Sequence, residues 1–272
     1  MSLPVVLDVD TGVDDALAIL FAVRTSVADL RGVSCVGGNA PAGQVLRNTL
    51  AVLAEAGATD VDVAIGTDGP DTYVRTQHGR DAMADLALVS ARTPPPVTRA
   101  VDLLGVAAAG GTTVVAAGPL TNVARALDVH RCMSTPLVVV GGEDRDGALV
   151  PGEDDFNLTH DPLATRRVLR APMERRTLYP MRAFRAVTVP QRAAERMAAA
   201  HDPVTRLAGR LLVHQCRRGG GDGRIGDAGA LVATAHPEVV RGRRTASYGG
   251  QASVILDVDP SAVSAAFLDV FS

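Results

Sequence analysis

The chain has 272 residues, 47% of them hydrophobic, which is enough to build the core of one large α/β domain or two small ones. Its net charge of −3 gives no electrostatic case for nucleic acid or an anionic membrane as a partner. Lysine is absent, so mechanisms that need a lysine are excluded. Three isolated cysteines indicate no disulfide framework and fit a reducing cytoplasm. We expect no signal peptide and no transmembrane segment.

Apolar, β-branched runs alternate with segments of helical periodicity through the first half of the chain. The runs predict strands at 5–9, 30–36, 61–65, 112–117 and 136–140. The helical segments are expected at 14–20, 42–56, 80–89, 100–109 and 123–127. This alternation predicts βαβ units and a parallel sheet.

The second half of the chain is less regular. It begins with an acidic, glycine-containing loop at 143–157, and the glycine-rich segment 217–226 is expected to be mobile. Further strands are predicted at 176–179 and 251–258, and helices at 161–169, 190–200, 203–217, 227–235 and 260–271. No internal repeat or linker is evident, so we predict one domain over residues 1–272.

The predicted fold is therefore α/β, with a mainly parallel, Rossmann-like central sheet flanked by helices. In such sheets, ligands bind beyond the carboxyl ends of the strands. Four predicted strands end in polar turns that contain Asp10, Asn39, Thr121 and Gly142. We expect these four turns to meet at one crevice.

The first of these strand ends is unusually rich in carboxylates, since Asp8, Asp10, Asp14 and Asp15 lie within eight residues. A helix start can stabilise about one of these charges through its free N–H groups. Two carboxylates about 4 Å apart repel by about 4 kcal/mol at an effective dielectric constant of 20. A bound cation is the simplest remedy, although helix capping and solvated loop positions are an alternative.

Oxygen ligands suit a hard divalent cation, either Ca²⁺ or Mg²⁺. Zinc is disfavoured, because neither the six histidines nor the three cysteines have zinc-ligand spacing. A cation-bound water beside a spare carboxylate generates hydroxide at neutral pH, so the pattern favours metal-assisted hydrolysis. A Mg²⁺-dependent phosphatase of the haloacid-dehalogenase type is one alternative. Asp8 and Asp10 fit its paired aspartates, but its usual lysine is missing.

Five segments, in order along the chain, resemble the calcium-dependent nucleoside hydrolases of the inosine–uridine preferring type. They are LDVDTGVDDALAI at 7–19, Gly38-Asn39, GPLTN at 118–122, DFN at 155–157 followed by Asp161-Pro162, and GDA at 226–228. The resemblance extends over nearly the whole chain and implies the fold of that family.

The resemblance also implies roles for individual residues. Asp10 would act as general base on a Ca²⁺-bound water. Asp10, Asp15, the backbone carbonyl of Thr121 and Asp227 would hold the metal. The substrate would be held by Asp14, Asn39, His78, Asp155, Asn157 and Asp227, and Asp8 would support the site from behind. Taken alone, Asn39 could simply supply a left-handed turn, and Thr121 could cap the helix that follows it. His78 alone is more typical of an ordinary loop histidine, and Asp227 alone of a helix N-cap.

Three residues depart from the family pattern. Gly226 replaces a histidine that is thought to protonate the leaving base, Asp155 replaces a glutamate, and Leu149 falls near an expected asparagine. Leaving-group activation and recognition of the 5′-hydroxyl therefore differ from the pattern. The candidates for a substitute acid are His78, Arg224 and Tyr248.

The sequence thus predicts a cytoplasmic hydrolase of nucleoside salvage. It would cleave the N-glycosidic bond of ribonucleosides with Ca²⁺ as cofactor, through an oxocarbenium-like transition state. The family resemblance implies a homo-oligomer, either a dimer or a tetramer. The alternative from another class is a non-catalytic, Ca²⁺-stabilised protein that binds nucleosides or ribose.

Overall fold

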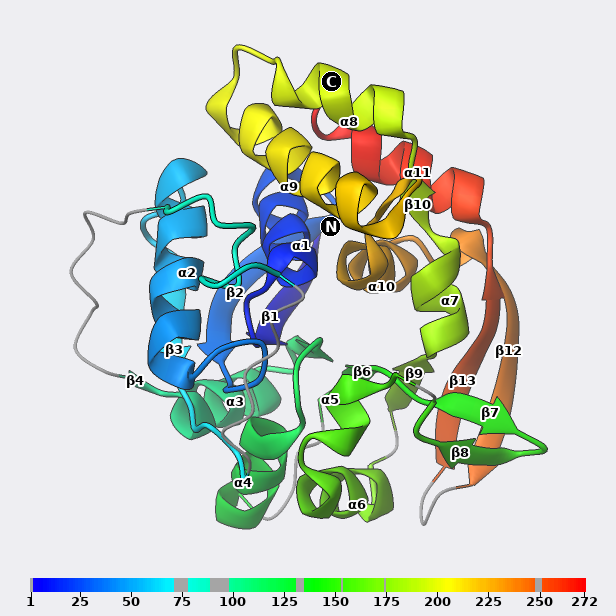
Figure 1. The fold of residues 1–272 in the computed structure, drawn as a ribbon. Coiled ribbons are helices and arrows are strands. Elements are labelled where there is room, and N and C mark those ends of the chain that lie inside the picture. Colours follow the sequence, from blue (N-terminus) through cyan, green and yellow to red (C-terminus); the bar gives the residue numbers. More distant parts are fainter. Residues whose placement is uncertain are drawn as a thin grey trace.

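A nine-stranded sheet runs through the molecule in the order β12-β13-β9-β6-β5-β1-β2-β3-β4 (Figure 1). Neighbouring strands are parallel except β12 and β13, which pair antiparallel at one edge. The computed structural model describes residues 2–70, 78–88, 98–130, 135–152, 154–173, 175–247 and 251–272. The strands are β1 (Leu3–Val9), β2 (Ala28–Cys35), β3 (Asp62–Ile65), β4 (Thr98–Arg99), β5 (Thr113–Ala116), β6 (Leu137–Val140), β9 (Arg176–Tyr179), β12 (Val240–Ser247) and β13 (Gln251–Val258). The predicted α/β fold with a mainly parallel sheet is confirmed.

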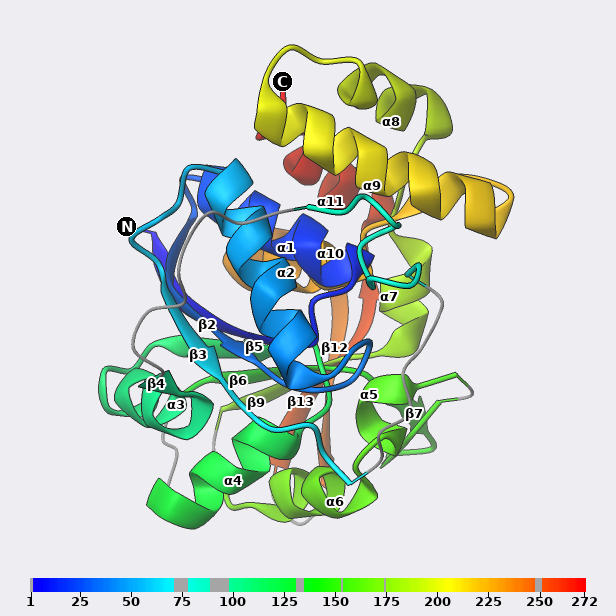
Figure 2. The same ribbon diagram turned by 60° about the vertical axis from the view of Figure 1, so that its left-hand side comes forward.

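Helices cover both faces of this sheet (Figure 2). One face is covered by α1, α2 and α10, with α9 packed on α1 and α11 packed on α10, and the opposite face packs against α3, α4 and α6. The helices are α1 (Val13–Arg24), α2 (Ala42–Glu55), α3 (Ala100–Ala109), α4 (Thr121–His130), α5 (Phe156–Thr159), α6 (Pro162–Arg170), α7 (Met181–Ala186), α8 (Gln191–Ala198), α9 (Pro203–Gly219), α10 (Gly226–Ala235) and α11 (Pro260–Asp269). None of the described helices is long and apolar enough to cross a membrane.

The central strands are apolar on both sides because both faces of the sheet are covered. Along β1, Val5, Leu7 and Val9 face the core beneath α1, whereas Val6 faces the core beneath α3 and α4. This two-sided burial explains why β1 appears in the sequence as a nearly continuous hydrophobic run. The run ends where the strand reaches the carboxyl edge of the sheet and Asp10 begins.

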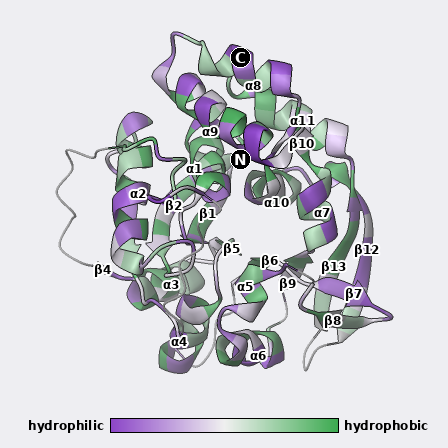
Figure 3. Cartoon of the chain, viewed as in Figure 1, coloured by the Kyte–Doolittle hydropathy of each residue, from purple (hydrophilic) through white to green (hydrophobic). Residues whose placement is uncertain are grey.

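Helix α10 is the most deeply enclosed of the helices that lead to this edge. Its residues from Gly226 to Ala233 are all buried, and it is coloured mostly hydrophobic, whereas α9 carries hydrophilic and hydrophobic stripes (Figure 3). Contacts with α1, α7 and α11 hold α10 in place. Asp227, in its first turn, is therefore a charged residue in an otherwise apolar position.

The predicted helix at 80–89 is wrong over the residues that the structure describes, 80–88. These residues form turns in which Ala82, Ala84, Asp85 and Ala87 have positive φ. The carboxylate of Asp81 accepts hydrogen bonds from the backbone N–H groups of Met83, Asp85 and Ala87. These bonds replace the helical ones, which is the usual way in which an aspartate competes with a helix.

Several elements of the second half differ from the sequence prediction. The acidic segment 143–157 contains a hairpin, β7 (Glu143–Arg145) and β8 (Ala148–Val150), and the start of α5. The glycine-rich segment 217–226 contains the end of α9, at Gly219, and the strand β11 (Gly223–Arg224), which pairs with β10 (Thr188–Val189). Strand β12 and helix α7 were not predicted.

Candidate active site

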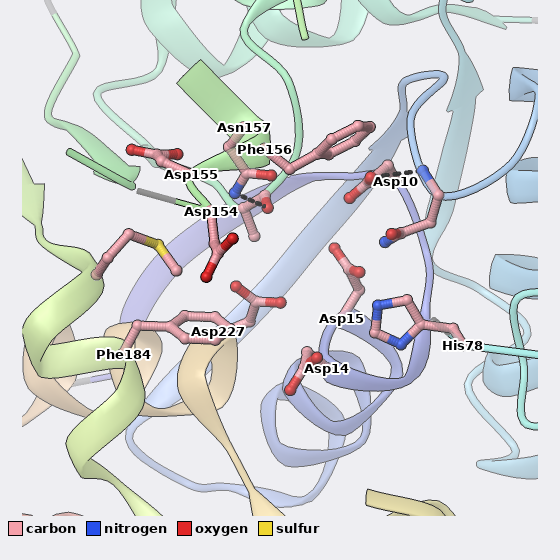
Figure 4. Close-up of a pocket in the computed structure, with 13 residues that line it drawn as sticks. Asp10, Asp14, Asp15, His78, Asp154, Asp155, Phe156, Asn157, Phe184 and Asp227 are labelled. Atoms are coloured by element: carbon pink, nitrogen blue, oxygen red, sulfur yellow. Dashed lines mark hydrogen bonds between the residues drawn. The ribbon is translucent and has the colours of Figure 1, made fainter. Parts of the chain in front are cut away.

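A pocket of about 90 Å³ lies at the carboxyl edge of the central strands (Figure 4). The loops after β1, β2 and β5 contribute to it, together with the starts of α1, α5 and α10 and one side of α7. Its lining residues are Asp10, Asp14, Asp15, Asn39, His78, Ala117, Asp154, Asp155, Phe156, Asn157, Met181, Phe184 and Asp227. Six of them are aspartates, and none of these described lining residues is an arginine.

Asp10 follows β1 directly, and its side chain is 2% exposed. The backbone N–H of Asn39 donates to its Oδ2 at 2.8 Å. Gly38 permits this approach, because a Cβ at that position would overlap the Asp10 carboxylate. The glycine of the Gly38-Asn39 turn is thus required by close packing, and the turn fixes the direction of the carboxylate.

Asp14 and Asp15 lie in the first turn of α1 and have different partners. The backbone N–H of Gly12 donates to Asp15 Oδ2 at 2.9 Å, as in an N-terminal cap, whereas Asp15 Oδ1 is buried with no hydrogen-bond partner. Asp14 is half-buried, and Gln215 Nε2 donates to its Oδ1 at 2.7 Å. Only one oxygen of Asp15 is therefore needed by the helix start.

Asp227 approaches from the opposite wall, in the first turn of α10. Its side chain is 4% exposed, and its Oδ1 is also buried without a hydrogen-bond partner. Burial and the negative charges of Asp15, Asp14 and Asp10 raise the pKa of Asp227 well above its usual range. Burial raises the pKa of Asp15 in the same way, and the charge of Asp10 adds to this effect.

Buried oxygens without partners and mutual repulsion fit a site that takes a hard cation, because a cation satisfies both. Asp10, Asp15 and Asp227 are carboxylates whose negative charges act on one another in this pocket. Among the described residues, no three His, Cys, Asp or Glu side chains already form a closed metal cage. Closing round an ion therefore requires rotation of these side chains.

Asp155 and Asn157 form the wall at the start of α5. Asp155 is 1% exposed and accepts hydrogen bonds from the backbone N–H groups of Gly142 at 2.5 Å and Leu158 at 3.2 Å. Asn157 Nδ2 donates to the carbonyl oxygens of Ala117 at 2.6 Å and Val140 at 3.1 Å. These bonds tie α5 to the ends of β5 and β6, and they leave Asn157 Oδ1 facing the pocket.

His78 lies on the side of the pocket that Gly12 and Asn39 form. Its Nδ1 accepts a hydrogen bond from the backbone N–H of Val13 at 3.3 Å, so its Nε2 carries the proton in the neutral ring. Of the other predicted acids, Arg224 belongs to β11 and does not line the pocket; burial raises the pKa of Asp14 to about 6, and the charge of Arg224 offsets part of that rise. Tyr248 lies outside the described residues.

Thr121 is the one predicted site residue that lies elsewhere. It begins α4, its Oγ1 donates to Asp161 Oδ2 at 2.8 Å, and it lines a separate cavity beside α6. Ala117, four residues earlier, lines the carboxylate pocket instead. Thr121 therefore lies away from the carboxylate pocket, beyond the turn that carries the chain from β5 into α4.

Comparison with known proteins agrees with this geometry. The family model for inosine-uridine preferring nucleoside hydrolase matches residues 5–264. The chain belongs to this family. A curated relative, the pyrimidine-specific ribonucleoside hydrolase RihA of Photobacterium profundum, is 31% identical over 181 residues, which cover 63% of this chain and 58% of the relative. The Salmonella newport protein of the same name is 29% identical over 222 residues, 78% of this chain and 71% of that relative. The chain thus spans less than two thirds of the first relative's length.

Solved structures show the same fold across nearly the entire chain. The plant nucleoside hydrolase PpNRh1 superposes with a TM-score of 0.86 at 20% identity, covering 98% of both chains. A purine-preferring ribonucleoside hydrolase from Gardnerella vaginalis also has a TM-score of 0.86, at 21% identity, covering 98% of this chain and 97% of that one. The nucleoside hydrolase fold expected from the sequence is confirmed.

Five pocket residues of this family member were not predicted from the sequence. A backbone carbonyl, as at Ala117, leaves no trace in residue type, and Phe156 appeared only as part of the DFN segment. The helix that carries Met181 and Phe184 was not predicted at all. Asp154 belongs to an acidic run in which no single residue stands out. These residues are Ala117, Asp154, Phe156, Met181 and Phe184.

Asp8 is buried beneath the carboxylate pocket and does not line it. It is fully buried, and its Oδ1 accepts hydrogen bonds from Ser34 Oγ at 2.5 Å and Asn122 Nδ2 at 2.9 Å. Its Oδ2 has no hydrogen-bond partner. Burial raises the pKa of Asp8 from 3.8 to about 6, despite the lowering effect of both hydrogen bonds.

Replacing Asp8 by Asn is expected to raise the melting temperature of the chelator-treated protein at pH 8 by much more than at pH 4. At pH 8 the wild-type carboxylate is ionised, and a shift from 3.8 to about 6 corresponds to at most about 3 kcal/mol of destabilisation. Asparagine keeps the acceptor for Ser34 and Asn122. Thermal unfolding at the two pH values measures the effect, and an equal shift at both would show that Asp8 does not titrate in this range.

Proposed function

We propose that the chain is an N-ribohydrolase that cleaves the N-glycosidic bond of a ribonucleoside to give ribose and the free base. The observation that carries the proposal is the convergence of Asp10, Asp14, Asp15 and Asp227 in one pocket, with two buried carboxylate oxygens lacking partners. A site built only to bind a neutral sugar has no need for so many buried negative charges, since each is costly without a cation.

Ca²⁺ is the proposed cofactor. Asp10, Asp15 and Asp227 would hold it, together with the backbone carbonyl of Ala117 in place of that of Thr121. When bound, Ca²⁺ supplies Lewis acidity, which lowers the pKa of a water molecule in the pocket. The unpartnered Oδ1 atoms of Asp15 and Asp227 are the atoms that support this assignment.

Asp10 is the proposed general base. Its Oδ2 is held by the backbone N–H of Asn39, so its Oδ1 is the oxygen that receives the proton of the attacking water. Asp14, Asn157 and Asp227 would hold the ribose hydroxyls. As the C1′–N bond breaks, positive charge develops on the sugar, and the surrounding carboxylates stabilise that charge. Asp155, with its oxygens held by backbone N–H groups, would lie towards the 5′-hydroxyl.

A cytoplasmic location and a homo-oligomeric state, a dimer or a tetramer, are part of the same proposal. Among the described residues, Cys35 and Cys216 are free and buried, which agrees with a reducing compartment. Sedimentation of the purified protein would measure the oligomeric state directly.

The test is calorimetric titration of the chelator-treated protein with Ca²⁺, followed by a reducing-sugar assay with inosine, uridine, adenosine, cytidine and p-nitrophenyl riboside. We expect one Ca²⁺ per chain and sugar release that depends on it. Tight binding of Ca²⁺ without release from any substrate would favour the non-catalytic binding protein. Release of phosphate from phosphate esters would favour the phosphatase, and absence of divalent binding would contradict the proposal.

A further inference from the structure

The wall of the pocket beside Asp227 has an aromatic ring where a side chain of residue 226 would lie. A Cβ built on Gly226 would overlap the ring of Phe184, which is half-buried on α7. Figure 4 shows this ring lying next to Asp227. Position 226 therefore cannot carry a proton-donating side chain while Phe184 is in place, and the apolar ring of Phe184 occupies that space.

The histidine of the pocket is on the other side. Figure 4 shows His78 next to Asp15, across the pocket from Phe184. The bond from the Val13 N–H to its Nδ1 holds it there. Among the described lining residues on the Phe184 side, the polar side chains are carboxylates, and Met181 adds a thioether. Among the described residues that line this side of the pocket, a leaving group against Phe184 thus meets no cationic side chain, hydroxyl group or imidazole.

Asp154 provides a negative charge on the side of the pocket where Phe184 lies. Its backbone has a positive φ of 66°, a left-handed conformation that Asp and Asn adopt more readily than most other residues. In Figure 4 its carboxylate points into the pocket, between Phe184 and Asp227. The side chain is exposed, and within the described part of the chain its carboxylate has no hydrogen-bond or ion-pair partner. An aromatic ring beside a free carboxylate is a typical recognition site for an organic cation.

From these three observations, and resting on the proposed hydrolase function, we infer that the site acts on ribosides whose glycosidic nitrogen already belongs to a cationic ring, such as an N7-alkylated purine or a pyridinium. The C1′–N bond breaks with its electron pair going to the ring, which leaves as a neutral heterocycle and needs no proton. The water oxygen bonds to C1′, and the released water proton goes to Asp10. The products are ribose, a neutral heterocycle and one proton.

The experiment compares N7-methylguanosine with guanosine, which differ by one methyl group and one charge, and nicotinamide riboside with uridine. Neutral p-nitrophenyl riboside, whose leaving group needs no acid, reports on the hydrolase function itself. A general acid contributes about 100-fold or more. We therefore expect kcat/KM for the cationic partner to exceed that for the neutral partner by about this factor.

Two variants separate recognition by this wall from the greater intrinsic lability of cationic ribosides. Asp154→Asn keeps a residue that tolerates positive φ but removes the charge, and it should lower the cationic-to-neutral ratio about fivefold. Asp146→Asn is the matched control, because Asp146 also has a positive φ, of 51°, and lies outside the pocket. The double variant Phe184→Ala/Gly226→His restores room for an acid and should raise turnover of guanosine relative to N7-methylguanosine.

The outcomes distinguish this inference from the proposed function. Hydrolysis of p-nitrophenyl riboside together with equal turnover of guanosine and N7-methylguanosine would overturn the inference and leave the hydrolase proposal standing. Efficient turnover of neutral nucleosides that disappears in His78→Asn would also overturn it, because His78 would then be the acid. If Asp154→Asn leaves the cationic-to-neutral ratio of kcat/KM unchanged, Asp154 does not recognise the positive charge of the substrate. If no riboside is hydrolysed, the proposed function fails, and the inference fails with it.

Discussion

Asp10→Asn is expected to lower kcat for p-nitrophenyl riboside by at least about 1,000-fold, within the range that a general base contributes. Asparagine retains the shape of the side chain, and its amide oxygen can still accept the hydrogen bond from the Asn39 N–H that Asp10 Oδ2 receives at 2.8 Å. It cannot take a proton from water. The measurement is initial-rate release of nitrophenol at saturating Ca²⁺.

The control for this variant is Asp146→Asn, the same chemical change on an exposed turn between β7 and β8. It should leave kcat and the Ca²⁺ affinity unchanged. Asp10 is also a proposed ligand, so Ca²⁺ binding by Asp10→Asn must be measured and saturation reached before kcat is compared. A variant that binds Ca²⁺ weakly but turns over normally when saturated would show that the base is another residue.

Much of this site was predictable because its residues lie where regular elements end. A buried strand, a turn and a helix start were evident at 7–19, and they place Asp10, Asp14 and Asp15 at the carboxyl edge of the sheet. Asn39 lies after the next strand and follows the same rule. The pocket brings all of them together with Asp227, although more than 200 residues separate Asp227 from Asp15.

The unpredicted part depends on contacts that residue type does not reveal. Ala117 lines the pocket through its position at the end of β5, and a sequence motif cannot tell its carbonyl from that of Thr121. Phe184 fills the side-chain space of Gly226 from 42 residues away along the chain. The turns at 80–88 arise because Asp81 binds three backbone N–H groups, a local competition that overrides apolar periodicity.

The metal-free protein is expected to lose stability as the pH rises from about 4 to above 6, and Ca²⁺ is expected to restore it. Burial raises the pKa values of Asp8 and Asp14 from 3.8 to about 6, and raises those of Asp15 and Asp227 well above 3.8. Between the unfolded and folded pKa values the native state binds more protons than the unfolded chain. A rise in pH across this window therefore favours unfolding.

Ca²⁺ counters this loss because it binds the ionised carboxylates of the native state and not the unfolded chain. At 100 times its dissociation constant, a ligand of this kind adds about 2.7 kcal/mol to the free energy of unfolding. Thermal unfolding from pH 4 to pH 8, with chelator and with excess Ca²⁺, measures both effects. Stability that rises with pH in chelator would contradict the pKa shifts.

Asp15→Asn distinguishes the loss of stability that the clustered negative charges cause from their proposed role in binding Ca²⁺. Asp15 Oδ2 caps α1 and its Oδ1 has no partner, so an amide oxygen can keep the cap while one buried charge is removed. The chelator-treated variant should therefore melt higher than wild type at pH 8, yet gain little from Ca²⁺ and release little sugar. Asp146→Asn should respond to Ca²⁺ as wild type does. If Ca²⁺ raises the melting temperature of Asp15→Asn as much as that of wild type, Asp15 is not a ligand, and the repulsion among these aspartates needs another explanation.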